Sequence, residues 1–381
     1  MWYNPSAKGI DQEAELEEVK KITKQFHLVL IPIKENKPES SWMQLTEKAW
    51  SGILKCITRR VPITYQGHCG VKTAFNSIYW LSIKSARDGD ILVENLGEIG
   101  KLKSKRIQKI VEDKLVYPLC RGREVKRWYY TTSNYIIVPH DPITGKPIPE
   151  RDMKINYPKA YDFLAQFKKQ LEGRSIHKLW GRGNPFYSLY DIGSYTFKAY
   201  KVAWKHIAGK ISGKAEFSAA VISPIDDKYL GKKIVIPDFS LTFTSTDNLD
   251  EAHYLVAFLN SSISRLIISS YTIETEISAH ILEHIRIPKF DRNNRLHLRL
   301  SELSKKAHKM TKQIREEKRE DLKDDLKHIE EEIDRIVAQL YGITDEELRE
   351  IRKCLKILME GEVEEEKEVE EEIALPKEEN V

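Results

Sequence analysis

The spacing of apolar residues divides the chain into a mixed first part and a helical last part. Short apolar runs bounded by turn residues predict strands at 28–33, 77–83, 90–96, 135–139, 199–207, 217–223, 233–237, 240–246 and 285–290. Apolar positions at helical spacing predict helices over 11–27, 42–57, 158–171, 250–269 and 277–285. We therefore expect an α+β fold, in which a mixed, β-rich body is followed by long C-terminal helices.

Two apolar runs near the C-terminus repeat at alternating steps of three and four residues. They consist of Leu296, Leu300, Leu303, Ala307, Met310 and Ile314, then Leu322, Leu326, Ile329, Ile333, Ile336 and Leu340. A heptad of this kind forms a coiled-coil-like seam that packs against another helix. The charged segment 315–321 interrupts the register, so the helix either continues with a stutter or turns back as a hairpin. Gly342 is suited to end the second helix, and Thr344 with Glu347 forms a capping box that opens a third.

These changes of pattern predict four parts of the chain. They are an N-terminal helix and strand segment (1–59), a β-rich domain (60–292), a helical heptad region (293–359) and an acidic tail (360–381). The tail holds eleven acidic residues and two lysines, a composition typical of disordered segments. We interpret the tail simply as an aid to solubility.

The net charge of +4 hides an uneven distribution along the chain. Residues 301–381 contain 16 Lys/Arg and 26 Asp/Glu, whereas residues 1–300 contain 46 and 32. A basic body of this kind is typical of proteins that bind polyanions.

Segment 173–215 concentrates the positive charge among aromatic residues. It holds eight Lys/Arg, one acid (Asp191) and eight aromatic side chains. Cations interleaved with flat apolar rings favour a nucleic-acid ligand, which offers phosphates and stackable bases. The competing interpretation places half of the aromatic side chains in the core and leaves the lysines solvated.

Two glycine-containing turns carry further cations. Arg121, Arg123, Lys126 and Arg127 surround Gly122, and an arginine fork can clamp a phosphate or read guanine. The alternative is a surface turn in which Arg123 or Lys126 pairs with Glu124, and the sequence leaves both open. Segment 65–76 (YQGHCGVKTAFN) lacks the spacing of a phosphate-binding P-loop, so we expect a tight turn before a strand.

No residue pattern in the chain predicts catalysis or a metal site. Asn184-Pro185-Phe186-Tyr187 resembles the Asn-Pro-Pro-Tyr loop of amino-methyltransferases, but the second proline and a preceding glycine-rich strand–turn–helix are missing. The four cysteines form no Cys-x-x-Cys pair, which favours a reducing cytoplasm and argues against structural zinc. The longest apolar stretches are too short to span a bilayer, so we expect no membrane association.

Six runs in order carry a resemblance to a known family. They are GHCGVKTAFN, VYPLCRGREVKRW, INYPKAYDFLAQFKKQLEGR, SYTFKAYKVAWK, YLVAFLNSSISRLIISS and ILEHIRIPKFD. Together, over about 60–290, they resemble the TaqI-like C-terminal specificity region. That region is the target recognition domain of type IIG restriction-modification enzymes and related adenine-N6 DNA methyltransferases. Segment 329–351 is similar to the helix that follows such domains, and type I specificity subunits carry comparable helices.

The resemblance implies sequence-specific binding of double-stranded DNA, as the specificity part of a restriction-modification system. Family enzymes place a methyltransferase domain before this region, but only about 60 residues precede it here. We therefore expect no enzymatic activity from the chain alone and no cofactor of its own. A partner methyltransferase or restriction subunit would supply S-adenosylmethionine and the adenine-N6 chemistry. The C-terminal helices would dock that partner or a second copy.

The resemblance also places DNA contacts on the basic segments. The residues we expect to contact phosphates or bases are Lys72, Arg121, Arg123, Lys126, Arg127, Arg182, Asn184, Lys198, Lys201 and Lys205. Two alternatives remain open. The chain is the C-terminal part of an adenine-specific methyltransferase or type IIG enzyme with its own activity, or it is a scaffold whose coiled coil is the functional part.

Overall fold

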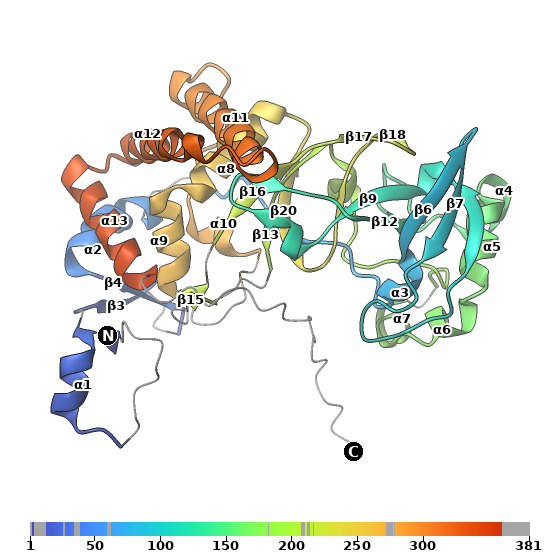
Figure 1. Ribbon diagram of the computed structural model, residues 1–381, viewed down its shortest axis with the longest axis horizontal. Helices are drawn as coiled ribbons and strands as arrows, with labels where there is room; N and C mark the ends of the chain where they lie inside the picture. The colour runs from blue at the N-terminus through green and yellow to red at the C-terminus, as the bar shows by residue number, and fades with distance from the viewer. Residues whose placement is uncertain are drawn as a thin grey trace.

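The computed structural model describes residues 2–3, 13–25, 27–33, 39–58, 62–181, 183–206, 210–211, 214–215, 217–271, 277 and 279–359. Figure 1 shows an elongated molecule with a six-stranded sheet and its helices at one end and the long C-terminal helices at the other. A four-stranded sheet lies between them. Helices and strands are largely segregated, which confirms the predicted α+β class.

The six-stranded sheet has the order β19-β9-β12-β6-β7-β8. Its strands are β19 (Ile236–Pro237), β9 (Val116–Cys120), β12 (Asn134–Ile137), β6 (Trp80–Arg87), β7 (Asp90–Asn95) and β8 (Gln108–Glu112). Only the β19–β9 pair is parallel among these strands. The helices α4 (Glu150–Asn156), α5 (Pro158–Ala165) and α6 (Lys168–Glu172) share one apolar core with this sheet.

The four-stranded sheet has the order β16-β13-β20-β5. Its strands are β16 (Ala219–Ile222), β13 (Tyr200–Lys205), β20 (Leu241–Thr246) and β5 (His68–Cys69). Side chains alternate across β13, so Val202 and Trp204 pack with the helical core while Ala203 joins a smaller core on the other face. Because β13 is an inner strand with both faces covered, its central residues are buried.

The predicted helix over 250–269 is two helices, α8 (Leu249–Asn260) and α9 (Ser262–Tyr271). Ser261 between them is extended, and its hydroxyl accepts a hydrogen bond from the Ser264 amide. The Asp334 carboxylate accepts from the Ser262 amide at 2.7 Å. These side-chain acceptors satisfy the first amides of α9, which makes a separate helix start stable there.

The heptad region folds as a hairpin, which resolves the two alternatives that the sequence left open. Helix α11 (Arg295–Glu316) and helix α12 (Lys323–Tyr341) pack on each other and are followed by α13 (Asp345–Met359). Gly342 is left-handed at the end of α12, and Thr344 and Glu347 form the predicted capping box. The seam residues Leu300, Leu303 and Ala307 are buried within the chain, where α11 lies on α8.

The N-terminal elements complete the same core. Strands β3 (Val29–Pro32) and β4 (Trp42–Leu45) form a hairpin that leads into α2 (Glu47–Ile57). Helix α13 packs on both α2 and α9. Gly52 allows this close approach, since a Cβ there would lie 2.9 Å from the Ile351 Cδ1 atom. One core therefore joins residues from near both ends of the chain.

Several predicted boundaries were wrong. The helix expected at 42–57 begins as strand β4, and the strand expected at 77–83 begins as the short helix α3 (Asn76–Tyr79). The helix expected at 158–171 breaks between α5 and α6, and 285–290 forms no strand. From the helix expected at 277–285, only α10 (Ile281–His284) is found among the described residues. The acidic tail, 360–381, lies outside the described residues.

Candidate nucleic-acid interface

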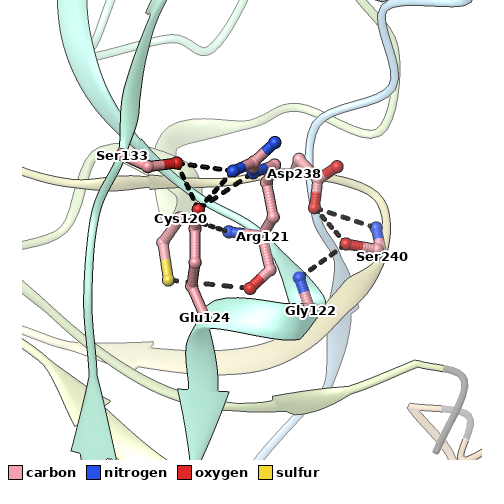
Figure 2. Close-up of polar contacts among 7 residues, drawn as sticks. All are labelled: Cys120, Arg121, Gly122, Glu124, Ser133, Asp238 and Ser240. Carbon is pink, nitrogen blue, oxygen red and sulfur yellow. Dashed lines mark hydrogen bonds and ion pairs between the residues drawn. The ribbon is translucent and has the colours of Figure 1, made fainter. Parts of the chain in front are cut away.

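The two glycine-containing segments, far apart in the sequence, meet at 237–240. The tight turn expected at 65–76 was wrong, because this segment holds strand β5 and extended residues paired with Asp238 and Tyr190, and it leads into helix α3. The Val71 amide donates to the Pro237 carbonyl at 2.9 Å. The Gly122 amide donates to the Ser240 hydroxyl at 2.7 Å, as Figure 2 shows. A Cβ on Gly70 would lie 1.9 Å from the Asp238 carbonyl oxygen, so only glycine permits this contact. The segment between β19 and β20 thus fixes both segments side by side.

Arg121 stabilises its own turn rather than facing a ligand. Its side chain is 8% exposed and forms an ion pair with the buried Glu124 carboxylate. The guanidinium also donates to the Ser133 hydroxyl (Figure 2). It lies over the Trp80 ring at 5.4 Å. The assignment of Arg121 as a DNA contact is therefore corrected, since the side chain is buried and its Nε and Nη2 groups are occupied by Glu124 and Ser133.

Arg123 has the opposite placement. It lies at the outer side of the 3-10 turn 122–124 and is exposed. Glu124 is occupied by Arg121, and Arg123 has no acidic partner within the part of the chain that the structure describes. This excludes the alternative in which Arg123 pairs with Glu124. Lys126, two residues beyond the turn, is partly exposed.

Arg127 belongs to a structural contact between the turn and the C-terminal helices. It pairs with Glu330 of α12 at 3.1 Å and donates to the Asn260 carbonyl at 3.0 Å. The neighbouring Trp128 is buried at a positive φ of 60°, and its indole N–H donates to the same Glu330 carboxylate at 2.7 Å. Such a strained backbone persists only where its surroundings hold it. Arg127 is therefore corrected from a DNA contact to an anchor.

Lys201 is completely buried on β13, so it was wrongly assigned to the DNA contacts. Its cross-strand neighbours are Ile222 and Ser245, and its Nζ atom has no hydrogen-bond partner. Burial lowers the pKa of Lys201 to about 7, while Asp247 opposes this change. Removing an amine from water disfavours its charged form, which explains the direction.

The other two lysines of this strand region keep access to solvent. Lys198 precedes β13, is exposed and lies 3.8 Å from Asp247. Lys205 ends the strand and is partly exposed. The strand alternation places Lys201 and Lys205 on one face, but only the strand end emerges from the sheet.

Lys72 and Asn184 lie on loops held together by a buried arginine that the sequence analysis missed. Arg174 is 3% exposed and donates to the carbonyls of Leu171, Thr73, Phe186 and Ser188 at 2.7–3.0 Å. Its guanidinium also lies over the rings of Tyr79 and Tyr190. Nothing in the sequence distinguishes this arginine from the exposed cations around it.

The loop ends are fixed to each other through their backbones. Lys72 and Tyr190 exchange two backbone hydrogen bonds of 2.9 and 3.0 Å. Lys72 is half-buried, and Asn184 is exposed. Arg182 lies outside the described residues. Phe186 and Tyr187 of the same loop are buried, and the Tyr187 hydroxyl donates to the Ile148 carbonyl.

A basic loop between β7 and β8 lies beside the segment that follows Lys72. Its exposed cations are Lys101, Lys103, Lys105 and Arg106. The buried Asn95 amide donates to the carbonyls of Ser77 and Lys105, and its oxygen accepts from the Ile107 amide. A Cβ on Gly100 would lie 3.6 Å from that of Asn76, which places the loop beside the start of α3. The sequence shows this charge run, but not that it is held in a fixed loop.

His140 connects the turn after β12 to the same group of loops. The ring is 1% exposed, its Nδ1 atom contacts the Gly145 carbonyl at 2.9 Å, and Nε2 accepts from the Leu189 amide at 2.9 Å. Burial lowers the pKa of His140 to about 4, although the Gly145 bond opposes this. The ring is therefore neutral at pH 7 and carries its proton on Nδ1.

We predict that acid destabilises the protein through His140. Because the folded-state pKa lies below the ordinary 6.5, the unfolded chain binds more protons between pH 6.5 and 4. The stability contributed by the neutral ring is present above pH 6.5 and is lost as the pH falls, by about 2–3 kcal/mol at pH 4.5. Urea unfolding at pH 7 and 4.5 measures this loss. His140→Gln, which does not titrate, should show a smaller difference; an equal difference would contradict the assignment.

The described residues contain no group of three His, Cys, Asp or Glu side chains arranged to hold a metal ion. Within the same ranges, no helix is long and apolar enough to cross a membrane.

Comparison with known proteins gives one sequence match. No family model matches the chain. A 187-residue region is 28% identical to the type II methyltransferase M.NspV of Nostoc sp.. The match covers 48% of this chain but only 33% of that protein, so the similarity concerns a part of the methyltransferase.

Two solved structures overlap with the fold at low sequence identity. The type IIL restriction-modification enzyme MmeI, solved in complex with DNA, gives a TM-score of 0.47 at 10% identity and covers 79% of this chain and 36% of that one. The type IIG restriction endonuclease BpuSI gives a TM-score of 0.31 at 11% sequence identity. The match covers 78% of this chain and 33% of BpuSI. The sequence match confirms the predicted relationship. Over about half its length, this chain is homologous to part of a type II methyltransferase.

Proposed function

We propose that the chain binds double-stranded DNA in a sequence-specific manner, as the specificity part of a restriction-modification system. The kinship with a type II methyltransferase supports a DNA-related role. The observation that carries the proposal is the joining of three separate basic segments. The extended segment 67–72 and the turn 121–124 meet at 237–240, and the loop 97–106 lies beside Asn76, a few residues after the first segment.

The residues proposed to contact DNA are those that keep access to solvent. They are Lys72, Lys101, Lys103, Lys105, Arg106, Arg123, Lys126, Asn184, Lys198 and Lys205. Lysine and arginine would neutralise phosphates and release counterions, which gives an affinity that falls with salt. Arg123 is the best candidate for a base contact, because its fork is exposed on a turn fixed by the buried Arg121–Glu124 pair.

The test is binding of the purified chain to a pool of duplexes with a randomised region, measured at several salt concentrations. A selected sequence motif and a steep salt dependence are expected. Absence of any duplex binding at low salt, both alone and with a methyltransferase from the same system, would overturn the proposal.

Arg123→Ala is predicted to relax specificity at one position of the selected motif. The loss of a bidentate base contact costs about 1–3 kcal/mol at that base pair and little elsewhere. Competition binding with single-base variants of the motif measures this. Arg87→Ala, a change at an exposed hairpin residue of β6, is the matched control and should change nothing. Uniform weakening at every position would show that Arg123 contacts phosphate instead.

The methyltransferase kinship also favours a second candidate, in which the chain is part of a methyltransferase with its own activity. Calorimetry with S-adenosylmethionine distinguishes the two. The proposal of a specificity part, located in the cytoplasm, predicts no binding of this cofactor by the chain alone and delivery of the methyl group by a partner subunit. Since the seam residues Leu300, Leu303 and Ala307 are buried within the chain, a partner or a second copy would dock on the exposed faces of the C-terminal helices.

A further inference from the structure

The turn that follows β12 exposes an aliphatic side chain on a fixed backbone. Ile143 is 84% exposed, more than any other large hydrophobic residue in the described part of the chain. Exposing this much apolar surface is unfavourable in water. In a flexible loop such a side chain could fold back onto the protein. In a rigid turn it stays exposed and available for a ligand.

The turn is held by its own polar groups. One Asp141 carboxylate oxygen accepts from the Ile143 amide at 3.0 Å and the Thr144 amide at 2.7 Å. The Asp141 amide donates to the Lys146 carbonyl, and the Gly145 amide donates back to the Asp141 carbonyl. These bonds close the turn at both ends and keep Ile143 at its tip.

The base of the turn is packed into the protein. Gly145 has a φ of +70°, and a Cβ there would lie 2.3 Å from the Cα of Gly193. The buried His140 ring bridges the Gly145 carbonyl and the Leu189 amide. The tip is therefore presented by a rigid base that is continuous with the segment 189–193.

That segment belongs to the proposed DNA interface. Tyr190 pairs through its backbone with Lys72, and its hydroxyl contacts the His177 ring of α7 (Ser175–Trp180) at 2.8 Å. The exposed residues beside Ile143 are Pro142, Thr144 and Lys146. The turn also carries one acid, Asp141, whose carboxylate is bound by the amides of Ile143 and Thr144. The exposed Lys146 beside the apolar tip supplies a cation that can meet a phosphate at the edge of a DNA groove.

We propose that Ile143 is a base-reading residue that contacts the C5-methyl group of a thymine in the major groove. This inference rests on the proposed function. The major groove admits elements as wide as a helix or a two-stranded ribbon, so a narrow turn fits. The thymine methyl group is the apolar feature of that groove, and aliphatic side chains are the groups that read it. A single isoleucine on a narrow turn is too small to form the core of a protein–protein interface.

The test uses the full chain and the duplex motif selected by the wild type. Each thymine of the motif is replaced in turn by deoxyuridine, which removes only the methyl group. For the wild type, one replacement should weaken binding roughly three- to tenfold, as expected for one buried methyl group with its packing contacts. Ile143→Ala should weaken binding to the parent duplex by a similar factor and lose further sensitivity at that one position.

Two other variants complete the design. Ile155→Ala changes a 65% exposed isoleucine on α4 and should leave both the affinity and the deoxyuridine profile unchanged. Gly145→Ala disturbs the base of the turn without touching the tip and should also abolish the sensitivity at that thymine.

The outcomes separate the two proposals. If the wild type selects a motif but no thymine couples to Ile143, the inference fails and the proposed function stands. Binding without any sequence preference would overturn both the inference and the sequence specificity of the proposed function. If the wild type binds no duplex, the proposed function itself fails. Ile143-dependent binding to lipid vesicles or a protein, in place of DNA, would assign the tip to another kind of partner and sink the inference.

Discussion

Changing Lys101, Lys103 and Lys105 together to glutamate is expected to reduce affinity for duplex DNA about a hundredfold or more at physiological salt. Each lysine is exposed on the loop held by Asn95, and each reversal replaces attraction to a phosphate by repulsion. The slope of the logarithm of affinity against the logarithm of salt should fall by about 0.9 for each phosphate that the variant no longer neutralises. Fluorescence anisotropy with a labelled duplex over a salt series measures both.

The matched control places the same charge change elsewhere. Lys306, Lys309 and Lys312 are exposed on α11, so their change to glutamate alters the net charge equally. If the control variant lost as much affinity as the loop variant, net charge alone would explain the effect. An unchanged salt slope in the loop variant would show that the loop lies off the DNA.

Replacing Lys201 with methionine is expected to stabilise the protein by about 4 kcal/mol at pH 7. The Lys201 amine is fully buried without a hydrogen-bond partner, and its pKa is lowered from 10.5 to about 7. Each pKa step corresponds to about 1.4 kcal/mol of difference between the protonation states. Methionine has a similar length and removes the amine that burial disfavours.

The pH dependence gives this prediction its signature. Since the unfolded chain holds the Lys201 proton up to about pH 10.5 and the folded chain only up to about pH 7, stability rises with pH across that window. In Lys201→Met the contribution of Lys201 to this rise in the free energy of unfolding should disappear. The difference in stability between the variant and the wild type should decrease as the pH approaches 10.5. Urea unfolding from pH 6 to 10 measures both curves. Lys232→Met, an exposed lysine on β18 (Gly231–Lys233), is the control and should follow the wild type.

Local patterns in the sequence predicted much of the helical region. The heptad steps located α11 and α12, and the Gly342 and Thr344–Glu347 signals located the boundary before α13. These features depend on residues within a few positions of each other, which the sequence displays directly. The break at Ser261 was missed because its cause, Asp334, lies 72 positions away from the Ser262 amide that it accepts from.

The candidate site shows the same limit. The number of cations located the basic segments. That number does not distinguish a lysine that faces solvent from a lysine that is buried between strands. Lys201 and Arg174 are buried because elements remote in the sequence cover them. Arg123 was predicted as a DNA-binding residue and remains a candidate, whereas the nearby Arg121 forms a buried ion pair with Glu124. Such choices depend on tertiary packing, which composition does not encode.

The pairing of α2 with α13 has a consequence for how the protein is made. Thr46 donates to the Cys354 sulfur, and Lys55 pairs with Glu347, so these contacts join positions about 300 residues apart. During synthesis the ribosome releases α2 long before α13 emerges. The apolar face of α2, with Ile53 at its centre, therefore stays without its α13 partner until α13 has been synthesised. Nascent chains stalled before residue 345 should therefore depend on chaperones, and closure of this core should be a late, slow step.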